Sequence, residues 1–198
     1  MKQEKQTIGR QNTKQLAVLV FEMPPGSQYD IGHQDSEDLA KAAFKELEKL
    51  AKKGEVAIES ATVVAKDENG TVKIRKTSEW TAGSGAGRGA FWGLLVGLVL
   101  AGPFAGLLAG IGLGAILGGR AHQPIDKDFM KDVGNRLKPG DSALFMLIEG
   151  DDEATINHLE AYAAPMYTTV LTDDVEEALE KASEHEDVLE AIKFDELD

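Results

Sequence analysis

The chain contains no cysteine, which excludes disulfides, thiol catalysis and cysteine metal sites. It also lacks an excess of basic residues, since 34 acidic side chains outnumber 21 lysines and arginines and the formal net charge is −13. Because nucleic-acid binding requires a basic surface, this charge argues against a nucleic-acid partner. Residues 1–14 contain no apolar run of the kind that secretory signals carry. We therefore expect the folded parts of the chain to be cytoplasmic.

One stretch lacks charge altogether: residues 89–119 contain no charged side chain, and Arg88 and Arg120 bracket them. Residues four apart lie above one another on a helix, so glycine at this spacing makes a groove without side chains. Each interior glycine costs a helix about 1 kcal/mol relative to alanine, and close packing of backbones is the usual compensation. The expected helix-packing glycines are Gly85, Gly89, Gly93, Gly97, Gly102, Gly106, Gly110, Gly114 and Gly118.

Gly102-Pro103 interrupts this stretch and predicts a helical hairpin. A single helix over residues 89–119 would run about 46 Å, longer than a hydrocarbon core of about 30 Å, whereas each arm would span about 25 Å. We expect a glycine-zipper hairpin that inserts into the lipid bilayer, with the membrane boundary at Arg88, Arg120, Trp80 and Trp92. Core packing is the competing account of the tryptophans. The alternative to insertion is a soluble homo-oligomer whose hairpins form a buried core.

The flanking segments predict an α+β fold. Residues 15–21 are a near-continuous apolar run, as expected of a strand buried on both faces. A helix opens at Asp35 or Ser36 and ends at Gly54, and Asn69-Gly70 predicts a primed hairpin turn. The other expected strands cover residues 56–66, 71–76, 142–149 and 166–171, and the other expected helices cover 126–137, 151–161 and 173 to about 194.

Strand–helix–strand occurs twice, which predicts a ferredoxin-like sandwich of two βαβ units with helices on one face of an antiparallel sheet and the hairpin inserted between the halves. We expect the acidic last helix to contact a protein partner. The expected parts are a disordered arm (1–14), two halves of the ferredoxin-like domain (15–80 and 121–172), the glycine-zipper hairpin (81–120) and the acidic C-terminal helix (173–198).

No pattern in the sequence points to chemistry. The histidines are scattered, and His33 with Asp30 and Asp35 is better explained as a solvated loop than as a metal corner. Asp151-Asp152-Glu153 is explained by helix capping, and Ser84 lacks the setting of a nucleophile. We predict no catalytic residue, no cofactor and no metal, and hence no enzyme.

Three segments, residues 61–70, 89–97 and 137–145, together resemble a bacterial family, domain of unknown function number twelve-sixty-nine, whose members are usually labelled membrane proteins. The resemblance covers residues 15–181 and implies no activity or catalytic residue. With the glycine pattern, it leads us to expect a non-enzymatic structural or regulatory module of the cell inner membrane. Such a module would self-associate through its hairpin into a homo-oligomer, with termini and folded domain in the cytoplasm.

Overall fold

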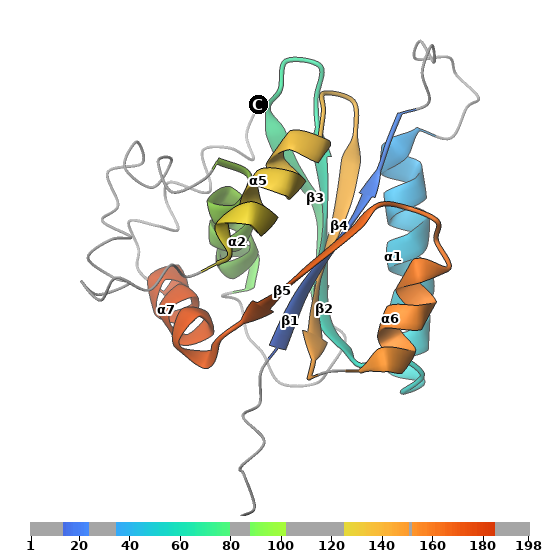
Figure 1. The fold of residues 1–198 in the computed structure, drawn as a ribbon, viewed down its shortest axis with the longest axis vertical. Coiled ribbons are helices and arrows are strands. Elements are labelled where there is room, and N and C mark those ends of the chain that lie inside the picture. The colour runs from blue at the N-terminus through green and yellow to red at the C-terminus, as the bar shows by residue number, and fades with distance from the viewer. Residues whose placement is uncertain (1–13, 24–34, 80–87, 102–124, 151, 185–198) are drawn as a thin grey trace, which may run out of the picture.

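A computed structural model describes residues 14–23, 35–79, 88–101, 125–150 and 152–184 (Figure 1). Residues 1–13 of the predicted arm 1–14, the second glycine arm from Gly102 to Gly118 and the end of the acidic helix lie outside the described residues. Lys14, the last residue of that arm, is instead the first residue of a strand. The described elements are β1 (Lys14–Phe21), α1 (Ser36–Lys52), β2 (Ile58–Lys66), β3 (Val72–Glu79), α2 (Arg88–Ala101), α5 (Lys127–Arg136), β4 (Ser142–Glu149), α6 (Glu153–Glu160), β5 (Met166–Leu171) and α7 (Asp173–Ser183).

The chain forms a mixed α and β fold around one antiparallel sheet of five strands in the order β3-β2-β4-β1-β5. The central strands β1 and β4 come from opposite halves of the sequence and pair over their whole length, from Lys14 opposite Glu149 to Phe21 opposite Ser142. The uncharged apolar runs of these two strands thus meet at the middle of the sheet, where both faces are removed from water.

Helices cover both faces of the sheet (Figure 1). On one face, Ala17 and Leu19 of β1 pack with Phe44 and Leu47 of α1 and with Leu159 of α6. The prediction of helices on one face only is therefore wrong. The near-continuous apolar run of β1 already required a cover on each side, because successive side chains of a strand point to opposite faces.

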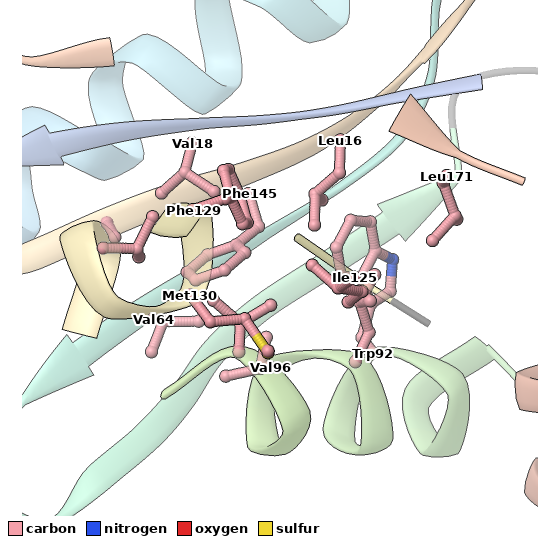
Figure 2. Packing of buried hydrophobic residues seen from close by; sticks show 14 of the residues in the cluster. Leu16, Val18, Val64, Trp92, Val96, Ile125, Phe129, Met130, Phe145 and Leu171 are labelled. Atoms are coloured by element: carbon pink, nitrogen blue, oxygen red, sulfur yellow. The ribbon is translucent and has the colours of Figure 1, made fainter. Parts of the chain in front are cut away.

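The opposite face is covered by α2, α5 and α7 (Figure 1). Leu16 and Val18 of β1 pack there with Trp92 and Val96 of α2 and with Phe129 of α5 (Figure 2). The first arm of the predicted hairpin is thus a layer of this core.

No helix in the part of the chain described here combines the length and the apolar character that crossing a bilayer requires. The prediction that the first glycine arm crosses the membrane is therefore wrong. The physical reason lies in α2, whose 14 residues extend about 21 Å and place their large side chains on the sheet. Trp92 is buried in this core, so core packing, and not a membrane boundary, explains its position.

The β2–β3 turn is not the primed type. Gly70 has a φ of +83°, but Asn69 is not among the non-glycine residues with positive φ, whereas a primed type I turn needs positive φ at both. Instead the Gly70 amide donates to Asp67 O at 2.9 Å, and the Asp67 carboxylate accepts from the amides of Asn69 and Thr71 at 3.0 and 2.8 Å. The aspartate side chain, rather than the Asn-Gly pair, therefore organises this turn.

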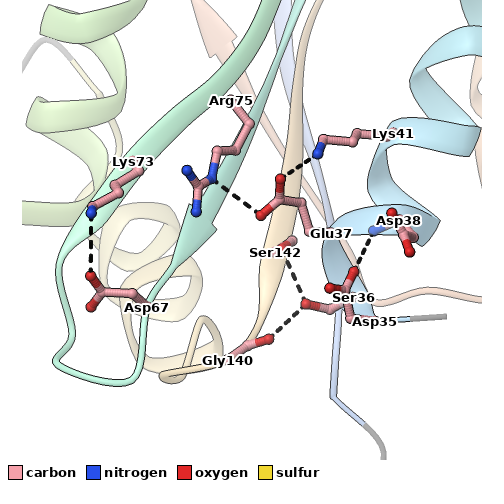
Figure 3. Close-up of polar contacts among 10 residues, drawn as sticks. All are labelled: Asp35, Ser36, Glu37, Asp38, Lys41, Asp67, Lys73, Arg75, Gly140 and Ser142. Atoms are coloured by element: carbon pink, nitrogen blue, oxygen red, sulfur yellow. Dashed lines mark hydrogen bonds and ion pairs between the residues drawn. The ribbon is translucent and has the colours of Figure 1, made fainter. Parts of the chain in front are cut away.

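Polar contacts join α1 to the sheet edge beside it (Figure 3). Asp35 caps α1 by accepting from the Asp38 amide at 2.7 Å. Glu37 in the first turn pairs with Lys41 on the same helix and with Arg75 of β3, whose Nε lies 3.1 Å from the carboxylate. The start of α1 is thereby tied to β3.

Candidate functional site

The helix α2 has two faces of different character. Its inner face consists of Phe91, Trp92, Leu95, Val96 and Val99, all buried against the sheet and the neighbouring helices. The rings of Phe91 and Trp92 meet edge to face, with centroids 5.8 Å apart. These residues follow the helical repeat, so one continuous stripe of large side chains faces the core.

The outer face of α2 carries glycine and leucine. Gly89 and Gly97 are exposed, and a Cβ added to either would meet no heavy atom within 4 Å. Leu94, Leu98 and Leu100 lie beside them and are only partly buried. We call this surface, made of Gly89, Gly93, Leu94, Gly97 and Leu98, the α2 outer face.

No charged residue follows Arg88 within α2, whereas each of the other described helices carries two or more exposed charged residues. Examples are Lys41 of α1, Lys131 of α5, Glu160 of α6 and Glu177 of α7. The α2 outer face is therefore distinguished by the lack of charge and by a row of glycines without side chains. Such a surface allows another backbone to approach closely without charge repulsion.

A partly buried ion cluster fixes α7 to the sheet. The ammonium of Lys14 in β1 lies 2.7 Å from the carboxylate of Glu59 in β2 and also pairs with Glu176 of α7. Burial would lower the pKa of Lys14, but the hydrogen bonds to Glu176 and Glu59 outweigh it and raise that pKa above 10.5. Since α7 also packs on α2, the cluster indirectly supports the layer that carries the outer face.

A second polar group caps α6. The Asp152 carboxylate accepts from the Thr155 hydroxyl and, at 3.2 Å, from the Thr155 amide. These bonds lower the pKa of Asp152, the hydroxyl bond contributing most. The Thr155 hydroxyl oxygen also accepts from the Ala57 amide at 2.7 Å, so the cap joins α6 to the chain entering β2. This group is therefore structural, as helix capping predicted.

Most of the remaining candidates from the sequence lie outside the described residues. Of the histidines only His158 is described, on the exposed side of α6, where its Nδ1 lies 3.1 Å from Ala154 O. Within the described ranges no group of three or more histidine, aspartate or glutamate side chains is placed to hold a metal. The candidates outside those ranges are His33, His122, His185, Asp30, Asp151, Ser84, Trp80 and Arg120, with Gly85, Gly102, Gly106, Gly110, Gly114 and Gly118.

Two features of this face were not predicted from the sequence. The first is the Lys14 cluster, whose members are up to 162 positions apart and carry no local signal. The second is a pair of buried polar atoms without a hydrogen-bond partner in the described structure, Ser60 Oγ and Trp92 Nε1. Only the pairing register places Ser60 beside Leu147 on the α2 side of the sheet.

A sequence-family profile described as "Protein of unknown function (DUF1269)" matches residues 86–184, from the approach to α2 to the end of α7. No curated protein and no solved structure matches the chain. The matched half contains the α2 outer face, α5, the central strand β4 and the edge strand β5.

Proposed function

This chain belongs to the family described as protein of unknown function (DUF1269), a description that assigns no activity, and we propose that it is a non-enzymatic structural or regulatory module whose copies associate through the α2 outer face. The observation that carries this proposal is the uncharged surface around the exposed Gly97, where an added Cβ would meet no heavy atom within 4 Å.

Charge favours a second copy as the occupant of this surface. Two copies with a formal charge of −13 each repel one another across most orientations. The α2 outer face contributes nothing to that repulsion, because it has no ionisable group. Two such faces are self-complementary, as a two-fold interface requires. Gly89 and Gly97, one above the other with Gly93 between them, let the backbones of two helices approach closely.

The strand order supports a ferredoxin-like body for this module. The strands of the two βαβ units, β1, β2, β4 and β5, lie in the order β5-β1-β4-β2, and β3 extends the sheet beyond β2. Both crossover helices, α1 and α6, lie on the same face (Figure 1). We propose that the two βαβ units form the body and that the glycine-zipper segment, beginning with α2, is the inserted element that mediates assembly.

A non-catalytic role is supported by how the polar groups are used. Asp152 and Thr155 bond each other and the backbone, and Lys14 is occupied by two carboxylates. A hollow between β1 and α6, lined by Gln15, Glu153, Ile156 and Asn157, holds about 180 Å³ and is open to solvent. This volume is below the ~300 Å³ at which ligand pockets usually begin.

The proposal is tested by the mass of the full chain in solution, measured by light scattering over a dilution series. Gly97→Glu places a charge on the α2 outer face, and the open space at this position means that the isolated protomer accepts the side chain. Ala42→Glu is the matched control, because Ala42 is exposed on α1, on the opposite side of the sheet. We expect an oligomer for the unmodified chain and for the control, and a fall in mass for Gly97→Glu.

Three results would overturn this assignment. One is a monomer at every concentration of the unmodified chain. Another is a Gly97→Glu protein of unchanged mass. A Gly97→Glu protein that loses stability as a monomer would mean that another part of the same chain covers this surface, which also contradicts association between copies.

A further inference from the structure

The two edge strands of the sheet differ in charge, and charge on an edge strand decides how readily it pairs with another chain. The edge strands are β3 and β5. Within the described residues β5 pairs only with β1, which leaves a row of backbone groups on its other side. In Figure 1 β5 is the strand drawn in front, and no helix is drawn across it.

The hydrogen-bonding pattern between β1 and β5 shows which residues of β5 have backbone groups that point away from β1. The Val20 amide donates to Pro165 O at 3.0 Å, and the register continues from Leu19 opposite Met166 to Lys14 opposite Leu171. In an antiparallel pair, residues whose backbone groups bond the partner alternate with residues whose groups point away. Because Pro165 bonds β1, the amides and carbonyls of Met166, Thr168 and Val170 point away from β1.

The sequence of β5 does nothing to prevent pairing on that side. The strand Met-Tyr-Thr-Thr-Val-Leu has no charge, proline or glycine, and β-branched and aromatic residues favour strands. Thr168 is exposed, and Val170 is 52% exposed, the one large hydrophobic side chain so exposed in the described part of the chain.

The opposite edge, β3, is protected by charge. It carries Lys73, Arg75 and Lys76, and lysine-rich edges are a usual means of preventing strand addition. Two β3 edges would bring these cations together, whereas two β5 edges bring together neutral residues only. The charge pattern thus favours β5 over β3 as the edge that meets a second copy.

We propose that β5 pairs antiparallel with β5 of a second copy, with Thr168 opposite Thr168 at the two-fold axis. In this register Met166 faces Val170 of the partner, and all three residues with outward backbone groups lie in hydrogen-bonded pairs. A shift by two residues would leave one of the three without a partner within the strand. The sheet then continues through both copies, and each helix layer continues on its own side.

This interface is separate from the α2 outer face and goes beyond the proposed function. The outer face lies on a helix layer, whereas the β5 contact lies at the edge of the sheet and uses backbone bonds. Either contact can therefore be absent while the other forms.

The lack of cysteine makes the register directly testable, since any introduced thiol is the only one in the chain. Residues in a hydrogen-bonded antiparallel pair have Cα atoms about 5.5 Å apart, within the range of about 4.4–6.8 Å that disulfides need. We expect Thr168→Cys to give a covalent dimer under mild oxidation. Val170→Cys is the matched control, because its two copies would lie roughly 14 Å apart in this register and should remain unlinked. Ala42→Cys, on exposed α1, controls for random collision.

The cross-linking is carried out in the full chain with Gly97→Glu also present, so that association through α2 does not contribute. A Thr168→Cys dimer with unlinked controls supports the β5 pairing even if the α2 proposal fails. No disulfide at Thr168, or linkage of Val170→Cys or Ala42→Cys to the same extent, overturns it.

Amide hydrogen exchange of the unmodified chain supplies a second measurement that needs no substitution. The amides of Tyr167 and Thr169 face β1, so they should be protected at every concentration. The amides of Thr168 and Val170 should become protected only as copies associate. Protection of Thr168 and Val170 in a monomer would show that another segment of the same chain occupies this edge, and would overturn the proposal.

Discussion

The hydroxyl of Ser36, the first residue of α1, donates to the carbonyl of Gly140 at 2.6 Å across 104 positions of sequence (Figure 3). The same hydroxyl lies 3.1 Å from Ser142 Oγ, and both serines are buried. This contact ties the start of a helix in the first half of the chain to the entry of the central strand β4 in the second half. It is therefore a buried polar link between the two βαβ units.

Ser36→Ala should lower the free energy of unfolding by about 1–3 kcal/mol, because it leaves the Gly140 carbonyl and the Ser142 hydroxyl short of a partner in a buried site. Urea unfolding followed by circular dichroism measures the effect. Asp35→Ala is the comparison, since it removes only the exposed helix cap and should cost about 1 kcal/mol. A Ser36→Ala protein as stable as the unmodified chain would show that the link contributes nothing.

Asp152 should make stability depend on pH in the acid range. Its pKa is lowered in the folded chain from an ordinary value of 3.8, so its contribution is complete above that value and is lost as the pH falls through the lowered pKa. Asp152→Asn keeps an acceptor for the Thr155 amide but has no charge to lose, so the difference in unfolding free energy between the two proteins should shrink below pH 4. Denaturant unfolding from pH 7 to pH 2 measures it. A difference that is constant with pH would contradict the assignment.

Much of the body could be predicted because its signals are local. The apolar run from Leu16 to Phe21, the cap at Asp35 and the strand from Met166 to Leu171 appear where the patterns place them. In each case a feature of a few neighbouring residues decides the local structure. The three features are an unbroken apolar run, a capping carboxylate and a β-branched segment.

The position of α2 could not be predicted, because no local signal in its sequence sets its orientation. Residues 89–101 are apolar or glycine on every side, so helical periodicity does not reveal which side faces the core. Trp92 and Leu95 face the sheet while Gly97 faces outward, and only the demand of β1 and β4 for a second cover selects that orientation. The Lys14 cluster was equally hidden, because its members meet only when the sheet and α7 are assembled.

The glycines themselves should divide into those that tolerate a side chain and those that do not. Gly97→Ala should raise the free energy of unfolding by up to about 1 kcal/mol, since alanine is the better helix former and meets no neighbour. Gly140→Ala should lower it by about 1–2 kcal/mol, because φ is +89° there and the new Cβ lies 3.4 Å from Met23 Cε.

Thermal and urea unfolding of both variants, at concentrations low enough to keep the protein dissociated, compare the two glycines under the same conditions. A destabilised Gly97→Ala protein would mean that the outer side of α2 is more crowded within one chain than the described residues indicate.

Lys14 should stabilise the fold up to strongly alkaline pH. Its pKa is raised above the ordinary 10.5 because the hydrogen bonds to Glu176 and Glu59 exceed the cost of burial. A group with a raised pKa contributes its full stabilisation below the unfolded value and loses it as the pH rises through the folded value. Stability should therefore fall above pH 10.5 in the unmodified chain. Lys14→Gln should cost about 2 kcal/mol at neutral pH, since it leaves two carboxylates facing each other without a cation.

A double replacement separates the pair energy from simple loss of packing. Lys14→Gln combined with Glu176→Gln removes the cation together with one of its two carboxylates, so the double variant should be more stable than the sum of the single losses predicts. Chemical unfolding at pH 7 and pH 11 measures all four proteins. If the single losses add and the unmodified chain shows no alkaline decline, the ion cluster does not hold α7 against the sheet, and the layer that carries the α2 outer face depends on apolar packing by Val175 and Leu179 alone.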